Sequence, residues 1–531
     1  MIYGLIRVFL AFCAAFVVYL IYFLIIRPYL WRRKYQAYSN VLVGKKFSPI
    51  IGDLSNEMQC INDNKVHYSY YKELAQETKK YDLKAKLEGP ESCISIISSK
   101  ALKEFLNLQK TCVDRYYMRK GLAEMVIDSI ASRKSTPDIQ QRRKNVTQYL
   151  GLNSASKYIP HMIGCCEKIV QSMIEEKDSD IMHYMNELTF NVFTEVLFGS
   201  GVEKLVTQLY PYQNADGTTE DITLREILIR VSKCYIDQYY NPLTFIAPFL
   251  SISPFSSFIS PDSSYYKLVN PYRRDHNNLQ VFKRAIKNIV QTSSDTNSVG
   301  RKFFDLPELT ERQKIDDLVG IMIAGSETTS HTLVSCLYFM SRHPETLQKL
   351  REELNREGLS KGEAFVENCT LETLQNCTYL SCIVKETLRL DSAVADTFDY
   401  EPSRDITICG VPISKGQRIK IDLLTNHFDS DKWLDPEAFI PDRHDTESEF
   451  FKESKEAGKV ADVYARRSFS HGNRNCPGQS FALLEARIVI AYLATHIDYE
   501  FDLEVENEQG VGFGLATQFL PRIRAKMHGQ N

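Results

Sequence analysis

The chain has 531 residues, of which 44% are hydrophobic, and its formal net charge is −3. This composition is ordinary for a globular protein, and so weak a charge argues against a chain-wide basic surface for nucleic acid. The 13 cysteines are irregularly spaced and form no CxxC pair, which argues against a disulfide framework or a zinc ribbon. We therefore expect reduced thiols in a body that faces the cytosol.

The N-terminal segment predicts a membrane anchor. Val8–Ile26 is an unbroken apolar and aromatic run of 19 residues, about the length that spans a bilayer core. No small-residue cleavage site follows it, so it does not read as a secretory signal peptide, and a core helix would carry polar residues on one face. Only Arg7 precedes the run, whereas four basic residues follow it: Arg27, Arg32, Arg33 and Lys34. The positive-inside rule then places the body in the cytosol, with Tyr29 and Trp31 in the interfacial aromatic belt.

The N-terminal anchor and the motifs described below divide the chain into three predicted segments. Residues 1–27 form the transmembrane signal anchor, and residues 28–54 form a basic hinge that includes the Pro/Gly stretch Lys45–Leu54. Residues 55–531 form one catalytic domain, because the motifs described below must converge in space. In a cytosolic body the N-x-T sequons at Asn145, Asn368 and Asn376 stay unglycosylated.

Within the body the pattern is mainly helical, with short strand-like pieces such as Cys93–Ser99. Met185–Gly201 has apolar residues at helical intervals, and Gly199 and Gly201 are plausible stops. Tyr239–Pro261 is apolar and aromatic but carries four prolines, so it is neither a long helix nor a central strand. Such a loop either packs beneath other elements or enters lipid, and we favour a membrane-facing roof over a pocket.

The clearest predicted helix runs from about Leu309 to Arg342 and ends before Pro344. Gly325 and a run of polar residues, Ser326–Ser330, interrupt its apolar pattern near the middle. A glycine inside a helix costs about 1 kcal/mol relative to alanine, so it usually reflects close packing. Polar residues there indicate a cavity or a hydrated site.

Cys476 lies in "FSHGNRNCPGQS", between a glycine-containing cationic turn and a helical sequence. Pro477 suits the first position of that helix, where its missing N–H costs nothing. The free N–H groups and dipole of a helix N-terminus favour a thiolate over a thiol. The pattern is therefore typical of a metal-bound sulfur.

Four motifs in order resemble those of the cytochrome P-450 family. "FSHGNRNCPG" matches F-x-x-G-x-R-x-C-x-G, "AGSETT" matches the central-helix motif, and "ETLR" supplies the E-x-x-R pair. "DPEAFIPDRH" resembles the segment that brings a further arginine. The resemblance implies the P-450 fold, mainly α with a smaller β region, preceded by the transmembrane helix.

The resemblance also implies that the cofactor is haem b and that Cys476 is its proximal thiolate ligand. A charged sulfur pushes electron density onto iron and favours O–O cleavage. Arg474 would pair with a haem propionate, and Phe469 would exclude water from the sulfur. The remaining cofactor-binding positions are small residues that permit a turn or close approach: Gly472, Gly478, Ala324 and Gly325.

Two further groups have implied roles. Glu327 and Thr328 would order water and deliver protons on the distal side, and Thr328 can also bond the Ala324 carbonyl. Glu386, Arg389 and Arg443 would form a buried structural triad that locks the loop presenting Cys476.

The sequence departs from the family pattern at several places. Asp138 stands where an early helix usually has tryptophan, Tyr400 lies near the position of a usual arginine, and His444 replaces a final phenylalanine. A usual Pro-Pro is replaced around Asp391 and Ser392. The propionate contacts besides Arg474 stay open, with His471 and Arg142 as candidates to compensate.

These observations predict a monooxygenase that oxidises a lipophilic small molecule, a fatty acid, sterol or foreign compound, with O2 and electrons from NADPH. The chain has no GxGxxG dinucleotide site, so a separate diflavin reductase in the same endoplasmic reticulum membrane would supply the electrons. It would dock near Arg142, Arg143 and Lys144. The alternatives are a haem-thiolate isomerase or dehydratase that does not use O2, and a haem-binding pseudoenzyme. A zinc-binding scaffold fails because only Cys476 and His471 lie close enough in sequence to serve as ligands.

The resemblance also places the pocket walls, although they do not identify the substrate. The segments concerned are Cys112–Ser135, Ile229–Pro261, Ile321–Thr329, Asp391–Phe398 and Leu515–Phe519. Arg115, Arg119 and Lys120 are either carboxylate-binding groups, which would suit a fatty acid, or surface charges.

Overall fold

The computed structural model describes residues 2–44, 48, 52–53, 75–89, 91–116, 125–176, 179–240, 273–501 and 522–528. Some of the expectations above concern residues outside these ranges, so they stay predictions. They are most of the hinge Lys45–Leu54, the proline-broken segment after Tyr240, the pocket residues Arg119 and Lys120, and Leu515–Phe519.

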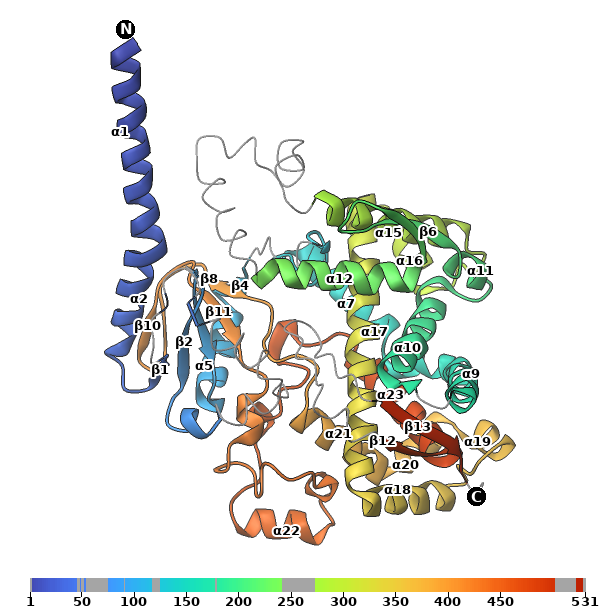
Figure 1. Cartoon of the computed structure of the whole chain (residues 1–531). Helices are drawn as coiled ribbons and strands as arrows, with labels where there is room; N and C mark the ends of the chain where they lie inside the picture. The colour runs from blue at the N-terminus through green and yellow to red at the C-terminus, as the bar shows by residue number, and fades with distance from the viewer. Residues whose placement is uncertain are drawn as a thin grey trace.

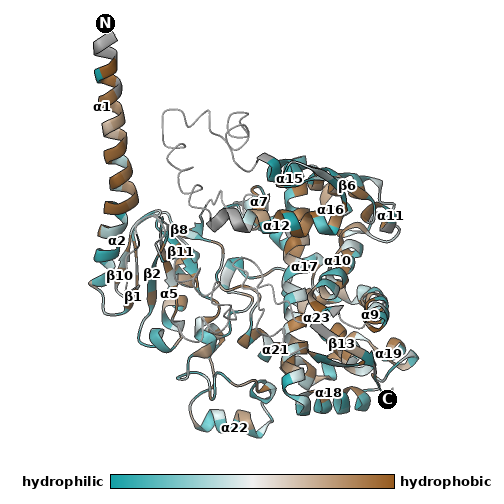
Figure 2. Cartoon of the chain, viewed as in Figure 1, coloured by the Kyte–Doolittle hydropathy of each residue, from teal (hydrophilic) through white to brown (hydrophobic). Residues whose placement is uncertain are grey.

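The N-terminus is one long helix that projects from the body (Figure 1). It comprises α1 (Ile2–Ile21), one π-helical turn (Tyr22–Ile26) and α2 (Arg27–Gln36). Among the described residues it is the one helix long and apolar enough to cross a membrane, and its apolar part is not buried in the protein. Figure 2 shows the hydrophobic residues that cover most of α1.

The segment after the anchor differs from the predicted hinge, because residues 28–43 belong to the folded body. α2 docks on the sheet region, where the Trp31 indole N–H donates to Gln417 Oε1 at 2.8 Å and the Tyr35 hydroxyl donates to the Pro412 carbonyl at 3.2 Å. Arg32 is buried, and Val41–Val43 form strand β1. Trp31 is thus held by protein contacts, and its expected place in an interfacial belt stays a prediction.

A six-stranded sheet forms the smaller lobe, in the order β1-β2-β3-β11-β8-β4. Its other strands are β2 (Leu83–Glu88), β3 (Glu91–Ile96), β11 (Arg418–Ile421), β8 (Tyr400–Pro402) and β4 (Val113–Arg115). Helix α5 (Ser99–Gln109) contributes Ala101, Leu102 and Phe105 to the same apolar cluster as the strands. β4 pairs with β8 antiparallel, which places Arg115 opposite Tyr400.

The larger lobe is helical, as the resemblance implied (Figure 1). Its longer helices are α7 (Pro137–Tyr149), α9 (Ile159–Glu175), α10 (Ile181–Phe198), α12 (Leu224–Tyr240), α15 (Arg273–Thr292), α17 (Glu311–Arg342), α18 (Pro344–Arg356), α21 (Thr378–Leu390) and α23 (Gln479–His496). Shorter helices are α8 (Leu152–Ala155), α11 (Glu203–Val206), α16 (Val299–Phe304), α19 (Glu363–Asn368), α20 (Leu371–Asn376) and α22 (Glu449–Glu456). Small sheets join β5 (Ser179–Asp180), β12 (Ile497–Phe501) and β13 (Arg522–Met527), β6 (Leu209–Gln213) and β7 (Thr219–Thr223), and β9 (Ile406–Ile408) and β10 (Val411–Ile413).

The predicted central helix is confirmed as α17. It begins with a capping box in which the Thr310 side chain accepts from the Gln313 backbone and the Gln313 side chain accepts from Thr310. The predicted stop at Gly199 is also confirmed, because α10 ends there with a glycine φ of 80°.

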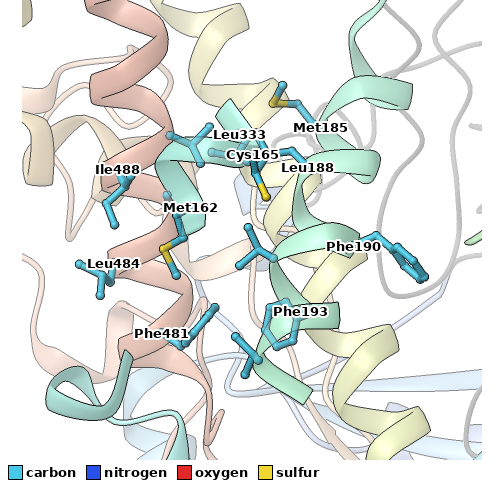
Figure 3. Close-up of a cluster of buried hydrophobic side chains, with 14 of the residues drawn as sticks. Met162, Cys165, Met185, Leu188, Phe190, Phe193, Leu333, Phe481, Leu484 and Ile488 are labelled. Atoms are coloured by element: carbon cyan, nitrogen blue, oxygen red, sulfur yellow. The ribbon is translucent and has the colours of Figure 1, made fainter. Parts of the chain in front are cut away.

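The main core lies where α9, α10, α17 and α23 meet (Figure 3). Phe193 of α10 and Phe481 of α23 have ring centroids 5.0 Å apart, and Met162 and Leu333 are fully buried in the same cluster. Burying a large apolar side chain contributes roughly 1.5–3 kcal/mol, so this contact region fixes α23 against α17. That packing positions the loop that precedes α23.

Candidate functional site

The loop before α23 folds into a braced turn around Cys476. Gly472 has a φ of 75°, and a Cβ there would lie 2.2 Å from Gln109 Oε1, so only glycine fits. The same Gln109 oxygen accepts from the Asn473 backbone N–H at 3.1 Å. The Cys476 N–H donates to the Phe469 carbonyl at 2.9 Å, which closes the turn and leaves the Cys476 side chain half-buried.

Helix α23 begins two residues later than predicted. Pro477 and Gly478 form a turn, Gly478 is the N-cap, and Gln479 is the first helical residue. Pro477 therefore precedes the helix. The hydrogen bond from the Cys476 N–H to the Phe469 carbonyl keeps the residues up to Cys476 in the loop. Burial raises the pKa of the Cys476 thiol, while the Gly478 N–H and Arg143 lower it. A thiolate at this position therefore gains from a bound cation.

The polar cluster in α17 divides between two faces. Ser326 and Ser330 face α10: Thr189 donates to the Ser326 carbonyl at 3.0 Å, and Ser330 donates to Asn186 Oδ1 at 2.5 Å. Gly325 also has a packing reason, because a Cβ would lie 2.2 Å from the Phe193 ring. The structure thus gives Gly325 a role in helix packing, where the sequence suggested approach to a cofactor.

The other face of α17 keeps accessible surface although the helix crosses the lobe. Ala324 is exposed there, and Glu327 and Thr328 are half-buried. The Thr328 hydroxyl donates to the Ala324 carbonyl at 2.6 Å, the back-bond expected from the sequence. This face is the accessible part of the central helix that a cofactor or substrate could contact.

Glu327 lies on this face, and among the described residues no charged group acts on it. Burial raises its pKa to about 7, and the hydroxyl of Ser232 on α12 opposes the shift. A carboxyl with such a pKa holds its proton part of the time at neutral pH and can release it. The predicted acid and hydroxyl are adjacent residues on the same accessible face.

Glu386 lies at the centre of a fully buried network with Arg389, Arg443 and His444, which we call the Glu386 network. Arg389 donates to both carboxylate oxygens at 2.8 Å, and Arg443 Nε donates to Oε1 at 2.8 Å. His444 Nε2 lies 2.9 Å from Oε2. The three residues of the expected triad are therefore in contact, and His444, first noted as a departure from the family pattern, joins them.

The Glu386 network connects to the Cys476 loop through two buried side chains. Arg389 donates to the His427 carbonyl at 2.8 Å, and the His427 ring Nε2 accepts from the Arg467 N–H at 3.0 Å. Burial lowers the pKa of His427 to about 3, so the ring is neutral and able to accept. Arg467 donates to the Asp422 carbonyl at 2.9 Å, and its own carbonyl accepts from Ser470.

A second group of basic residues lies beside the same loop. We call Arg115, Arg143, Arg474 and the phenol of Tyr400 the cationic cluster. The Arg143 side chain donates to the Asn475 carbonyl at 2.7 Å, and Arg474 is buried. Burial lowers the pKa of Arg143 to about 10, with further lowering by Arg474 and Arg115.

Three sequence-based assignments change as a result. Arg142, a candidate for cofactor contact, is buried and donates from Nε to Asp317 Oδ2 on α17 at 2.7 Å. His471 lies 2.8 Å from the Arg466 carbonyl. Arg115 is buried and belongs to the cationic cluster, so it is not a surface charge. The adjacent residue Arg143 takes the place beside the Cys476 loop.

The residues present fit haem, a flat apolar ring with an iron centre and two carboxylates. Cys476 supplies the sulfur, and Ala324, on the accessible face of α17, is exposed. Arg474 has a buried Nε without a hydrogen-bond partner. No protein atom lies closer than 3.6 Å to a Cβ built on Gly478, so the protein itself does not require glycine there. Among the described residues, no group of three or more His, Cys, Asp or Glu could hold a metal ion.

Two residues of the site were missed by sequence reasoning. Gln109 of α5 supports the turn, but it lies more than 360 positions before the cysteine and no motif marks it. Arg143 was assigned to a docking surface, and the choice between two neighbouring arginines depends on how α7 is rotated. The 13-residue helix buries Ile139, Arg142 and Val146 on one side, which turns Arg143 toward the loop.

A braced turn of this kind, which presents sulfur at the start of a buried helix, suits a prosthetic group held through a thiolate. Comparison with known proteins agrees with this class: a family model described as Cytochrome P450 matches residues 58–511. The chain therefore belongs to the cytochrome P450 family.

Individual relatives are similar over only part of their length. Cytochrome P450 3A2 of Rattus norvegicus is 26% identical over 327 residues, 59% of this chain and 57% of that protein. Cytochrome P450 52A1 of Candida tropicalis is 34% identical over 203 residues, 36% of this chain and 35% of that protein. Cytochrome P450 CYP82J17 of Trigonella foenum-graecum is 30% identical over 207 residues, 39% of this chain and 37% of that protein. The matched segments thus cover between about a third and three fifths of these relatives.

Proposed function

We propose that the chain is a haem-thiolate monooxygenase that oxidises a lipophilic small molecule. The observation that carries the proposal is the Cys476 turn, which the glycine at 472 and the side chain of Gln109 shape. Membership of the cytochrome P450 family supports the class of reaction. Bound haem would supply the oxygen activation and the insertion of one oxygen atom into the substrate.

The residues of the chain would hold the iron, limit the access of water and transfer the proton. Cys476 would hold the iron, and Phe469, half-buried against the main core, would limit access of water to the sulfur. Glu327 would hold a proton near neutral pH and pass it toward Thr328, its neighbour on the accessible face. The Thr328 hydroxyl, already donating to the Ala324 carbonyl, would keep its lone pairs free to accept a hydrogen bond from a water that carries that proton.

The Glu386 network would hold the loop in position. It has no accessible surface at Glu386, and its contacts reach the loop through His427 and Arg467. These contacts support a structural role for Glu386, Arg389 and Arg443.

We further propose that the apolar N-terminal helix anchors the chain in the endoplasmic reticulum membrane with the body in the cytosol. A diflavin reductase would supply electrons from NADPH at a surface that includes Arg143 and the exposed Lys144. Fatty acids, sterols and foreign compounds remain equal substrate candidates, since Arg115 belongs to the cationic cluster.

The full-length chain in detergent tests the central proposal. The reduced protein with CO should show the long-wavelength Soret band of a thiolate-ligated haem, and Cys476→Ser should abolish that band. NADPH and reductase should then drive substrate-dependent oxygen uptake. Conversion of a substrate without O2 or NADPH would favour the isomerase or dehydratase alternative, and an intact Soret band in Cys476→Ser would refute the proposed ligand. A screen for substrate-induced spin-state shifts would identify the substrate class.

A further inference from the structure

Arg115 and Tyr400 face each other across the last two strands of the six-stranded sheet. They are Cα partners in the antiparallel β4–β8 pair, and the Arg115 guanidinium lies 4.5 Å from the centre of the Tyr400 ring. The Tyr400 ring is also fixed by an edge-to-face contact with Phe105 of α5, with centroids 5.2 Å apart. Packing from both sides therefore holds the phenol in one orientation.

The two side chains carry buried donors without partners. Tyr400 is 0% exposed and Arg115 is 5% exposed, yet the Tyr400 hydroxyl and Arg115 Nε have no hydrogen-bond partner among the described residues. Arg115 NH1, in contrast, donates a hydrogen bond to the Phe398 carbonyl at 2.9 Å. An unsatisfied buried polar group costs about 1–3 kcal/mol, so two in one cross-strand pair indicate a missing acceptor.

Arg474 has the same deficit next to this pair. Its NH1 donates to the Ile130 carbonyl at 2.9 Å and its NH2 to the Arg133 carbonyl at 2.6 Å, while Nε has no hydrogen-bond partner in the part of the chain that the structure describes. The side chain of Asp114 lies 3.3 Å from Arg474 NH2. That carboxylate already accepts from the Ser135 N–H and hydroxyl, so it does not supply the missing acceptor.

The positive charges of the cationic cluster indicate that the missing hydrogen-bond acceptor is negatively charged. The cluster brings together three guanidinium groups, Arg115, Arg143 and Arg474, and among the described residues Asp114 forms an ion pair with Arg474. Burial lowers the pKa of Arg474, and Arg115 lowers it further, while Asp114 opposes both. A carboxylate from outside the chain would accept from the free donors and balance the positive charge.

We propose that Tyr400 is a cofactor-binding residue whose phenol donates a hydrogen bond to a haem propionate, with Arg115 as its cross-strand partner. The inference rests on the proposed function and adds the residues that hold the cofactor carboxylates besides Arg474. Tyr400 lies near the position at which the family pattern has arginine, so this chain uses a neutral donor there. The Arg115 guanidinium stacked on its ring supplies the positive charge that a phenol lacks.

Tyr400→Phe in the full-length chain in detergent tests the inference, because it removes one oxygen and keeps the ring. We expect haem to transfer to excess apomyoglobin about tenfold faster, the size expected for one hydrogen bond to a charged group. The reduction potential of the haem should fall, because a propionate without its donor leaves more negative charge near the iron. The position of the reduced-CO Soret band should not change, since Cys476 remains the ligand.

Tyr35→Phe is the matched control, because its hydroxyl, in the same lobe, donates to a protein carbonyl. That variant should release haem at the wild-type rate. If Tyr400→Phe is isolated without haem, titration of haem into its apoprotein should give a dissociation constant about tenfold above that of wild-type apoprotein. A wild-type release rate or dissociation constant in Tyr400→Phe would overturn the inference, whereas a wild-type chain that binds no haem would overturn the proposed function.

Discussion

The Glu386 network and the cationic cluster each bury at least two guanidinium groups near the Cys476 loop, but only the first has a carboxylate of the chain at its centre. Glu386 accepts from Arg389, from Arg443 and from the Ile440 N–H. In the cationic cluster, Arg474 meets carbonyl oxygens and a carboxylate shared with Ser135. Glu386 balances the positive charge of the first group, whereas under the proposed function the second group would gain its counter-charge from the cofactor carboxylates.

The difference separates two kinds of buried charge. A closed network stabilises the fold whether or not a cofactor is present, and breaking it leaves an uncompensated charge. An open cluster destabilises the empty protein, and ligand binding recovers the loss as binding free energy. Substitutions in the Glu386 network should therefore act on folding, and substitutions in the cationic cluster should act on cofactor retention.

The largest expected effect is that of Glu386→Gln. The substitution removes the negative charge from between Arg389 and Arg443, and breaking a buried pair of this kind costs about 3–5 kcal/mol. We expect most of the variant to be lost as aggregate when the full-length chain is extracted into detergent. Glu449→Gln is the control, because its pair with Lys452 is exposed and should contribute almost nothing. Equal yields of monodisperse Glu386→Gln and wild-type protein would contradict the closed-network interpretation.

Arg142 and Arg143 provide the same contrast at adjacent positions. Arg142→Gln leaves Asp317 buried without its partner and should destabilise the protein by about 3 kcal/mol. Arg143→Gln removes a half-buried cation and should change the unfolding temperature far less. Its effect should be faster haem release, because one positive charge of the cationic cluster is lost.

Unfolding followed by circular dichroism and haem transfer to apomyoglobin measure the two effects separately. The two variants are compared under conditions that give them equal unfolding free energies. If Arg142→Gln then releases haem faster than Arg143→Gln, the assignment of Arg143 to the cationic cluster is wrong.

These contacts show what the sequence could and could not specify. The long helix to Arg342 and the stop at Gly199 were predictable, because apolar spacing, caps and glycines act locally. Arg142 and Arg143 were not separable, since both follow the same helical pattern and only the tertiary rotation of α7 decides which one meets Asp317. The contact of His444 with Glu386 was missed because the family pattern has phenylalanine at that position and so indicates no polar partner there.

The docked segment α2 was missed because basic and aromatic residues next to an anchor also suit a lipid interface. The bond from Trp31 to Gln417 spans 386 positions, and no local pattern indicates such a partner. In the candidate site, motif residues were placed correctly in contact where both partners lie in motifs, as in Glu386 and Arg443. Supporting residues such as Gln109 lie outside every motif.

Glu485 sharpens the comparison, because it is a fully buried carboxyl without any arginine. Neither oxygen has a hydrogen-bond partner among the described residues, and burial raises its pKa well above the usual value of 4.5. The unfolded chain loses this proton above about pH 4.5 while the folded chain keeps it, so stability falls as the pH rises above that value. The loss of stability continues until the pH reaches the raised pKa of the folded chain.

Glu485→Gln removes this titration and keeps the shape of the side chain. The variant should unfold close to the wild-type temperature at pH 5 and above it at pH 7.5, as measured by circular dichroism in detergent. Identical shifts at both pH values would show that Glu485 ionises alike in the folded and unfolded chain.

The smallest expected effect is that of His444→Phe. Burial lowers the pKa of His444, so the ring is neutral and Nε2–H donates to Glu386 Oε2 while Nδ1 stays buried without a partner. Phenylalanine loses the one hydrogen bond but also removes the unsatisfied Nδ1, and Oε2 still accepts from Arg389. Because the gains and losses offset each other, we expect the unfolding free energy to change by less than about 1 kcal/mol. His444→Ala leaves a cavity beside Trp433 and should cost more. If His444→Phe destabilised the chain as strongly as Glu386→Gln, the histidine would be an essential fourth member of the network, and the two arginines would not suffice to balance Glu386.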